Sequence, residues 1–341
     1  MKVLTFVIPA YNSEKFLDKC ILSMLSDEIL DKLEIIVVND GSTDATATIA
    51  EKYSREYPGV VRLISQENKG HGGALNTGCA AAQGKYLKVI DADDWVQTGN
   101  LPEYIRLLEA CESDVVLTHY HTVDISTDEI KPWKSFPQVF GRNYTFEEIM
   151  ADWKSFDRCL TFHGITYRTA FYHEQGVQLS EHVFYEDHEF ATFPCCRAAS
   201  VMPLELFLYE YRIGDVNQSV SNANQLKRIG HTQTVIRHMS RHLKQIPAGG
   251  GRGYAIMKIQ ALLMSYLITE LLVNPDKRSG RAAANRFMEE CRELVPEAVN
   301  MLKGKYRVFA AMNRLHISKK TWDRILSLDL YNKIRGNHGF N

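Results

Sequence analysis

Three aspartates stand within four residues at the end of a short apolar run. Residues 86–90 are followed by Asp91, Asp93 and Asp94, and such a run is typical of a buried parallel strand. Ligands in open α/β sheets bind at the carboxyl ends of such strands. Crowded carboxylates repel one another unless a cation joins them, and hard oxygen ligands favour Mg²⁺ or Mn²⁺. The pattern predicts a divalent cation that holds a phosphate. The alternative is an Asp-rich turn in which Asp94 caps the next helix.

Two earlier apolar runs also end in residues that suit a nucleotide. The first leads into Pro9, Ala10 and Tyr11, a tight corner whose aromatic ring can pack on a nucleobase. The second leads to Asp40, whose carboxylate can accept a hydrogen bond from a base N–H. Residues 40–42 are equally a good turn sequence.

A polar, glycine-rich loop at residues 66–73 precedes a helix of small residues. It contains Lys69 and Gly70, and its backbone N–H groups next to a helix N-terminus can cradle a diphosphate. A flexible loop is the alternative. The sequence matches neither the P-loop nor a G-x-G-x-x-G motif after the first strand.

The spacing of apolar residues predicts the elements that bring these positions together. Strands over 3–8, 33–38, 60–64 and 86–90 alternate with helices over 16–24, 44–57 and 74–82. This is typical of a doubly wound α/β fold with a mainly parallel sheet. The pattern then predicts helices over 101–111, 146–153 and 169–175, strands over 114–119, 162–167 and 201–211, and an irregular segment over 122–144. We expect a helical C-terminal region, interrupted at 249–253 by a hinge or turn, and two domains, 1–222 and 223–341.

The motifs together resemble those of the family-two glycosyltransferases of the GT-A fold. The resemblance rests on VIPAYN at 7–12, VVNDGSTD at 37–44, the spacing of Asn68, Gly70, Asn76 and Gly78, and residues 84–94 with their three aspartates. It is strong over residues 3–95, moderate to about residue 215 and slight beyond. It implies a nucleotide-sugar donor, usually a UDP-sugar, and Mn²⁺ or Mg²⁺ as cofactor.

By this resemblance Asp40 would contact the base and Asp91 the nucleoside or sugar. Asp93 would coordinate the metal on the diphosphate, with Asp94 as a second ligand. The remaining donor contacts would come from Pro9, Ala10, Tyr11, Lys69, Gly70, Asn76 and Ala92. The sequence departs from the family at Leu75, where many members have an arginine, so the positive contact to the phosphates is either missing or supplied by Lys69.

A second acidic stretch, residues 185–190, is similar to the family's E-D-x-x-F element. Glycosyl transfer needs a base for the acceptor hydroxyl, and the resemblance assigns this role to Asp187. Glu186 beside it would raise its pKa. A base opposite the leaving group implies inversion at the anomeric carbon. The alternative is an acidic helix N-terminus stabilised by the helix dipole.

His163 and Arg168 fall where such proteins shape the acceptor pocket, to which Glu186 would also contribute. Residues 218–221 resemble a loop that closes over the donor. The tryptophans Trp133, Trp153 and Trp322 could stack on sugars, but packing in the core or at an interface is the default expectation.

Composition bears on location and on the class of partner. The net charge of −1 does not indicate a nucleic-acid binder. Residues 301–341 carry a net charge of +7, so the other 300 residues sum to −8. Residues 319–335 interleave basic and apolar side chains, as in an amphipathic helix that binds a membrane surface. A solvated helix packed on the body is the alternative.

Seven cysteines without a C-x-x-C pair are typical of a reducing compartment. The N-terminal apolar run is too short for a signal peptide, and residues 254–273 read as a packed helix rather than a membrane span. These features predict a cytoplasmic protein, with peripheral association at the inner face of the cell membrane as a further hypothesis.

The sequence therefore predicts a metal-assisted, inverting glycosyltransferase that acts on a saccharide or lipid-linked saccharide. Two alternatives remain. A sugar nucleotidyltransferase would carry a glycine-rich, arginine-containing motif after the first strand, which residues 9–12 do not provide. A non-catalytic accessory subunit would not need to retain both Asp93 and Asp187.

Overall fold

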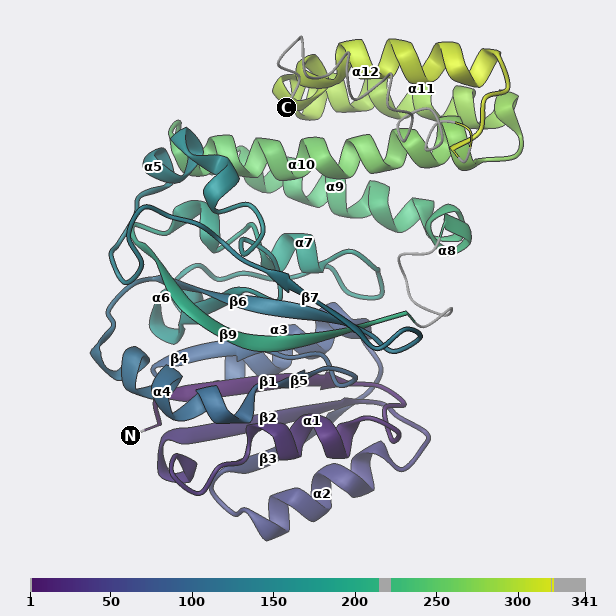
Figure 1. The fold of residues 1–341 in the computed structure, drawn as a ribbon. Coiled ribbons are helices and arrows are strands. Elements are labelled where there is room, and N and C mark those ends of the chain that lie inside the picture. The colour runs from purple at the N-terminus through teal and green to yellow at the C-terminus, as the bar shows by residue number, and fades with distance from the viewer. Residues whose placement is uncertain (1, 215–221, 320, 322–341) are drawn as a thin grey trace. The chain divides into compact units, whose positions relative to one another are not determined.

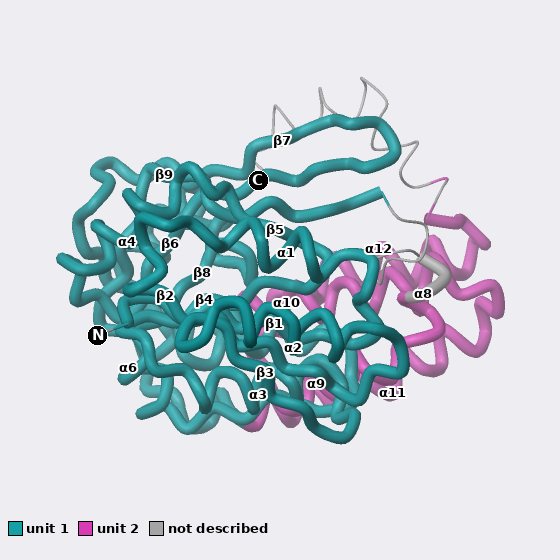
Figure 2. Tube along the Cα trace, turned by 90° about the horizontal axis from the view of Figure 1, so that it is seen from below, with its two compact units in different colours: residues 1–218, 242–255 teal, residues 219–241, 256–341 magenta. Residues whose placement is uncertain are grey.

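The computed structural model describes residues 2–214, 222–319 and 321. The chain divides into two compact units, residues 1–218 with 242–255 and residues 219–241 with 256–341 (Figure 2). The first switch between units lies close to the boundary predicted at residue 222. The return of residues 242–255 to the first unit was not predicted, because it depends on packing rather than on a change in composition.

One mixed sheet organises the first unit (Figure 1). Its strands are β1 (Leu4–Ala10), β2 (Leu33–Asp40), β3 (Val61–Gln66), β4 (Tyr86–Val89), β5 (Trp95–Val96), β6 (Val115–Asp124), β7 (Glu129–Trp133), β8 (Ile165–Arg168) and β9 (Val201–Ile213). The helices of this unit are α1 (Leu17–Met24), α2 (Thr46–Glu56), α3 (Gly70–Ala81), α4 (Leu101–Ala110), α5 (Phe146–Ala151), α6 (Thr169–Glu174) and α7 (Asp187–Phe190).

The strand order is β3-β2-β1-β4-β8-β6-β9-β5, and β7 pairs with the outer part of β6. The segment β3-β2-β1-β4 is parallel throughout. Beyond it β8 is antiparallel to β4 and β6, whereas β6 and β9 are parallel. The predicted α/β class is confirmed, with the parallel arrangement concentrated in the N-terminal half of the sheet.

Apolar side chains cover both faces of the parallel half. Phe6 and Ile8 of β1 belong to a core with residues of α1, α2 and α4, whereas Ile36 and Val38 of β2 pack with Ala74 of α3 on the other face. This burial on two faces explains why these strands read as continuous apolar runs. Gly78 lets α3 approach closely, because a Cβ there would lie 2.4 Å from Val7 Cγ1.

Two predicted elements differ from the structure. Helix α3 begins at Gly70 rather than at residue 74, so the second half of the expected glycine-rich loop, residues 70–73, is helical. A Cβ on Gly72 would lie 2.2 Å from the carbonyl oxygen of Ser180, so that glycine serves close packing. The segment expected to be irregular contains β7, an exposed strand that pairs antiparallel with β6; its Pro132 is typical of a sheet edge.

The glycines at 249–253 form the predicted turn but not a loose hinge. They lead from α9 (Ile229–Leu243) into α10 (Gly250–Ile268). A Cβ on Gly250 would lie 2.4 Å from the carbonyl carbon of Phe146, and one on Gly251 would lie 2.0 Å from the carbonyl oxygen of Cys196. The glycines therefore allow the helix to start against the backbone of the first unit.

The second unit is helical, as predicted. It contains α8 (Asn222–Lys227), most of α9 and α10, a π-helical turn (Thr269–Val273), α11 (Lys277–Leu294) and α12 (Pro296–Arg314). Arg237 of α9 forms two hydrogen bonds with Glu290 of α11, at 2.5 and 2.9 Å. Tyr266 packs on Phe287, with ring centroids 4.7 Å apart.

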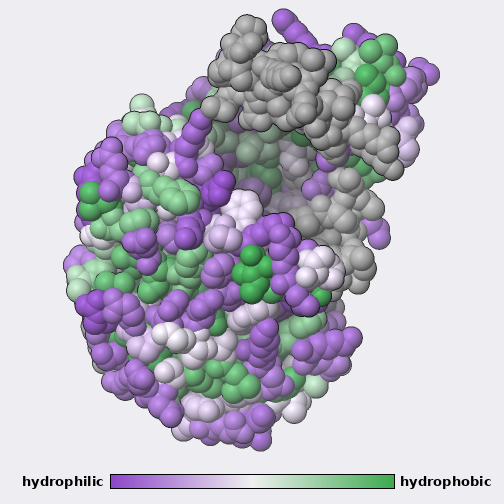
Figure 3. All heavy atoms as spheres, viewed as in Figure 1, coloured by the Kyte–Doolittle hydropathy of each residue, from purple (hydrophilic) through white to green (hydrophobic). Residues whose placement is uncertain are grey.

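One helical segment of the described residues, Gly250–Val273, is long and apolar enough to cross a membrane by length and composition, and half of it is buried. Core helices pass the same test, so this is weak evidence. The predicted donor-closing loop, residues 218–221, and most of the basic segment 319–335 lie outside the described residues. Hydrophilic and hydrophobic residues intermingle on the face of the first unit that Figure 3 shows.

Candidate functional site

Three parallel strands bring the predicted donor residues to one edge of the sheet. Ala10 of β1 pairs with Asn39 of β2, and Val7 of β1 pairs with Val89 of β4. Asp40, at the end of β2, and Asp91, shortly after β4, therefore lie at the same edge of the sheet on either side of β1. Pro9 and Ala10 are buried in β1 itself, whereas Tyr11 just beyond it is 54% exposed.

Asp40 is a buried carboxylate with one oxygen engaged. Its Oδ1 accepts hydrogen bonds from Gln66 Nε2 at 2.7 Å and from the backbone N–H of Lys69 at 2.9 Å. Its Oδ2 is buried and has no hydrogen-bond partner among the described residues. A buried acceptor without a donor is costly, so this oxygen suits a ligand N–H. Lys69 thus brings its backbone to Asp40, while its side chain is exposed.

Asp94 is the most strongly held of the three aspartates after β4. It is 2% exposed; its Oδ2 accepts from the Tyr209 hydroxyl at 2.5 Å and its Oδ1 from the backbone N–H of Arg212 at 2.7 Å. Burial, then the charges of Asp91 and Asp93, raise the pKa of Asp94 well above its ordinary value. Asp94 does not cap a helix; it ties its loop to β9.

Asp93 lies on the solvent side of the same loop. Its side chain is 41% exposed and its Oδ2 lies 3.6 Å from Arg212 Nη1. Burial and the charge of Asp91 raise the pKa of Asp93. Among the three aspartates, Asp93 is therefore the one that a cation can reach from solvent with least rearrangement.

Asp91 and Glu186 are joined by a histidine that the sequence analysis did not single out. His71, in the first turn of α3, contacts Asp91 Oδ1 through Nε2 at 2.9 Å and Glu186 Oε1 through Nδ1 at 2.5 Å. Burial alone would lower the pKa of His71, but the two carboxylates outweigh it and raise that pKa well above its usual value. The imidazolium therefore links the donor edge to the second acidic stretch.

Glu186 is directed at His71 rather than at solvent. It is 4% exposed, and its Oε2 is buried without a partner in the described part of the chain. Burial raises the pKa of Glu186, and the His71 contact opposes this. Asp187, the next residue, begins α7. The charge of Asp187 raises the pKa of Tyr211 and, against the larger effect of burial, opposes the lowering of the pKa of His163.

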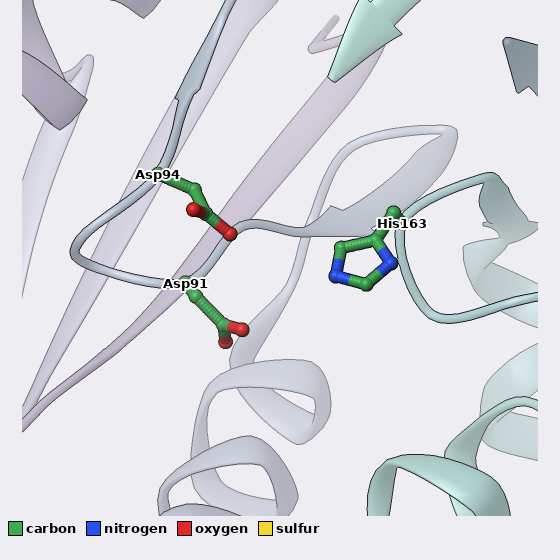
Figure 4. A group of neighbouring side chains, drawn as sticks. All are labelled: Asp91, Asp94 and His163. Atoms are coloured by element: carbon green, nitrogen blue, oxygen red, sulfur yellow. The ribbon is translucent and has the colours of Figure 1, made fainter. Parts of the chain in front are cut away.

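His163 stands between the two acidic stretches. One ligand atom of each of Asp91, Asp94 and His163 lies within 4.8 Å of the others, and Figure 4 shows the imidazole facing the two carboxylates. Burial lowers the pKa of His163 to about 4, so the ring is neutral and able to act as a ligand. Its Nδ1 is buried with no partner among the described residues.

Lys88 of β4 is hydrogen-bonded to the backbone of the segment that carries His163. Its ammonium donates to the carbonyl oxygens of His163 at 2.7 Å and Ile165 at 3.1 Å. Burial lowers the pKa of Lys88 to about 7. A lysine in the middle of an apolar strand indicates a buried polar contact, but the sequence does not show that its partners are the carbonyl groups of His163 and Ile165.

Two predicted site residues are engaged elsewhere. Arg168 pairs with Asp114 at 2.7 Å and lies opposite Tyr86, at the start of β4, because β8 runs antiparallel to β4. It is not brought together with Asp91. Asn76 exchanges hydrogen bonds with the backbone of Leu179, at 3.0 and 2.8 Å, and thereby holds the segment before α7. Neither position favours the ligand contact that was predicted.

Gly70, Ala92 and Tyr209 complete the site. Gly70 has φ of +74° and starts α3 beside the backbone of His182. Ala92 is buried between the aspartates. Tyr209 of β9 was missed in the sequence analysis, although it accepts from the Asp91 N–H at 3.1 Å and donates to Asp94. Only the pairing of β9 with β5 and β6 brings it there.

Comparisons with known proteins agree with this geometry. The family model "Glycosyl transferase family 2" matches residues 5–173. The chain is 43% identical over 134 residues to the uncharacterized glycosyltransferase YibD of Escherichia coli K12, covering 39% of this chain and 38% of YibD. It is 35% identical over 127 residues to chondroitin synthase of Escherichia coli, covering 37% of this chain and 18% of that protein.

Among solved structures, the chain is similar to Staphylococcus aureus TarS residues 1–349 in complex with UDP-GlcNAc, with a TM-score of 0.66, 19% identity and 93% of each chain covered. This similarity shows the GT-A-like fold. The chain matches only part of the length of its curated relatives. The matched share runs from 17% of Streptococcus pneumoniae GlyA to 52% of GlyG from the same organism. Residues 5–173 therefore form a domain of the family-two glycosyltransferases.

Proposed function

We propose that this protein transfers a sugar from a nucleoside diphosphate donor, a UDP-sugar, to a hydroxyl of a glycan acceptor with inversion. The observation that carries the proposal is the convergence at His163. Asp91 and Asp94 approach this ring after β4, and Asp187 begins α7 directly after Glu186, which His71 links to Asp91. The edge for a donor and the candidate base thus share one centre.

The nucleoside would occupy the ends of β1 and β2. The unpartnered Oδ2 of Asp40 would accept from the base N–H, and Tyr11 is exposed where a ring can stack. The first turn of α3, with the backbone of Gly70, offers N–H groups to a diphosphate. Asp91, whose charge His71 balances, would accept from a hydroxyl of the ribose or the sugar.

The residues present fit a divalent cation, since oxygen ligands and a neutral imidazole surround one point. Asp93 and Asp94 would hold it, with His163 beside Asp94. When bound, Mn²⁺ or Mg²⁺ neutralises charge on the departing diphosphate. Asp91 Oδ1 contacts the His71 imidazolium, and both oxygens of Asp94 accept hydrogen bonds, so Asp93 would be the ligand that a cation reaches first.

Asp187 would act as the general base. The acceptor oxygen attacks the anomeric carbon and forms the new glycosidic bond, while the carboxylate of Asp187 takes the hydroxyl proton. The bond between the anomeric carbon and the diphosphate oxygen breaks, and its electron pair leaves with the nucleoside diphosphate. Tyr167 fixes α7 for this role, because its hydroxyl donates to the carbonyl oxygen of Phe190 at 2.7 Å.

The first experiment is thermal unfolding with UDP, GDP, CDP, ADP or dTDP, each with and without Mn²⁺. A ligand that binds only the folded state adds about 2.7 kcal/mol at a hundredfold excess over its Kd. We expect a metal-dependent shift with UDP that is absent in Asp93→Asn. Release of sugar from a matching UDP-sugar would then demonstrate activity. A nucleotide shift without any sugar release would favour the accessory subunit, and release of pyrophosphate from UTP and a sugar phosphate would favour the nucleotidyltransferase.

A membrane-bound, lipid-linked acceptor is a separate part of the proposal. It rests on the basic C-terminal residues 301–341, most of whose last part lies outside the described residues. Liposome flotation with and without anionic lipid tests it. Co-flotation that requires anionic lipid supports it, and no flotation in either case removes it.

A further inference from the structure

The site continues sideways along one face of the sheet as a row of aromatic side chains. Paired residues of neighbouring strands point to the same face. Tyr209 of β9 pairs with Tyr120 of β6, and Tyr120 pairs with Trp133 of β7. The row therefore starts at the residue that holds Asp91 and Asp94 and ends at an edge strand.

Ring contacts make this row continuous with the candidate centre. His163 lies 4.9 Å from Tyr209 and 5.1 Å from Tyr120, measured between ring centroids. Tyr120 and Trp133 are parallel, with an interplanar angle of 1° and centroids 6.0 Å apart. An unbroken series of rings thus leads from His163 to Trp133.

Exposure changes along the row. Tyr209 and Tyr120 are buried, at 0% and 5% exposed, whereas Trp133 is 37% exposed. The guanidinium of Arg158 lies 5.6 Å from the centre of the Trp133 ring. An exposed indole with one guanidinium near its ring suits a sugar, because the C–H face of the sugar packs on the uncovered aromatic surface while its hydroxyls accept from the guanidinium.

We propose that Trp133, supported by Tyr120 and flanked by Arg158, is a subsite for a sugar of the acceptor glycan remote from the reacting hydroxyl. This inference rests on the proposed function, since it takes the centre at His163 as the place of reaction. Trp133 lies two strands from Tyr209, about 10 Å at the usual strand spacing. That separation makes the acceptor an oligosaccharide rather than a monosaccharide.

Strand β7 offers a matched control for this subsite. Ile130 is 59% exposed and pairs with Val123. Because side chains alternate along a strand and Ile130 is three residues from Trp133, its side chain points to the other face of the sheet. Ile130→Ala removes a comparable exposed apolar side chain without touching the row. Trp133→Phe keeps an aromatic face and reports whether the ring itself is required.

The test is a binding titration in the presence of UDP and Mn²⁺, with cello-, chito-, malto- and galacto-tetrasaccharides and their monosaccharides as probes. We expect at least one tetrasaccharide to bind the wild type and Ile130→Ala. We expect its Kd to rise about tenfold in Trp133→Ala and less in Trp133→Phe, the size of a lost stacking contact, with little change for the monosaccharide.

Two results would overturn the subsite: no tetrasaccharide binds the wild type, or Trp133→Ala binds it as tightly as the wild type does. The thermal midpoint of each variant without ligand shows whether it is folded. If Trp133→Ala is not folded, the Kd of Trp133→Phe is compared with that of the wild type instead. The UDP-induced shift of the wild type is an independent readout. Its absence would remove the proposed function, whereas its presence with unchanged tetrasaccharide binding would remove the subsite alone.

Discussion

The two halves of the sheet carry functional residues in different ways. In the parallel half, β3-β2-β1-β4, the candidate residues Asp40 and Asp91 follow strand ends and meet because neighbouring strands run the same way. In the mixed half, Tyr209, Tyr120 and Trp133 lie within strands and meet across them. A strand end can be recognised in a sequence, whereas a row across strands depends on a register that no single strand encodes.

The two halves also differ in whether their polar groups are open to a ligand or bonded within the protein. At the parallel edge, Asp40 and Asp93 keep oxygens open to a ligand. The mixed half supplies the groups that fix the loops, such as the Tyr209 hydroxyl on Asp94 and the Tyr167 hydroxyl on α7. One half thus provides ligands and the other provides positioning, with α7 as the exception that contributes a candidate base.

The sharpest challenge to this comparison is Asp187→Asn, which removes the one proton acceptor proposed outside the parallel half. We expect transfer to fall by about 10²–10⁴-fold, the usual contribution of a general base, while the UDP-induced thermal shift persists. Initial rates with a UDP-sugar measure it. Glu181→Gln, an exposed carboxylate of the preceding segment, is the control. Full activity in Asp187→Asn would mean that the base lies elsewhere.

Asp93→Asn and Asp94→Asn separate binding from positioning within one loop. Asp94→Asn should lower the free energy of unfolding by about 1–3 kcal/mol, because an amide cannot accept at both positions where Tyr209 and the Arg212 N–H now donate. Asp93→Asn should change that free energy little, since its side chain is 41% exposed and its contact with Arg212 is long, at 3.6 Å, yet it should abolish the metal-dependent UDP shift. Denaturant unfolding and thermal shift measure the two effects, and a reversed pattern would exchange the roles of the two residues.

Gly251→Ala tests whether the glycines in the first turn of α10 are needed for close packing in the first unit. The new Cβ would meet the Cys196 carbonyl oxygen at 2.0 Å, so we expect a loss of about 1–3 kcal/mol in the free energy of unfolding. Gly253→Ala is the matched control. Its Cβ would meet Met150 Cε at an ordinary 3.6 Å, and alanine should gain up to about 1 kcal/mol within a helix. Equal effects at both positions would restore the hinge interpretation.

His71→Gln gives the smallest effect and probes the link between the parallel edge and α7. Because the pKa of His71 is raised above the ordinary histidine value of 6.5, its contribution to stability is fully present below pH 6.5 and is lost as pH rises through the raised folded-state pKa. We expect the variant to be less stable by about 1 kcal/mol at pH 6, allowing for partial exposure, and the difference to shrink at higher pH. Guanidinium unfolding in EDTA across this range measures it. A difference that grows with pH would contradict the ionised contact.

Sequence patterns were sufficient for the first ninety residues and for much of the donor edge. Strands β1, β2 and β4 are buried throughout, so their apolar runs are unmistakable, whereas β3 is only partly buried after Val61. The start of α3 was misplaced because its glycines read as a loop, although Gly72 is required by the carbonyl of Ser180. Strand β7 was missed because every residue in it is exposed and it contains a proline.

The sequence by itself determined the family, the α/β class and the carboxylates at positions 91, 93, 94 and 187, because local runs and short motifs encode them. Only the tertiary structure decided that Arg168 faces Asp114, that Asn76 holds Leu179, that His71 joins Asp91 to Glu186 and that Trp133 continues the ring row from His163. Each of these contacts depends on the direction and register of strands or loops far apart in the chain. Local propensity carries no information about such pairing, because burial and cross-strand packing settle it only when the whole sheet forms.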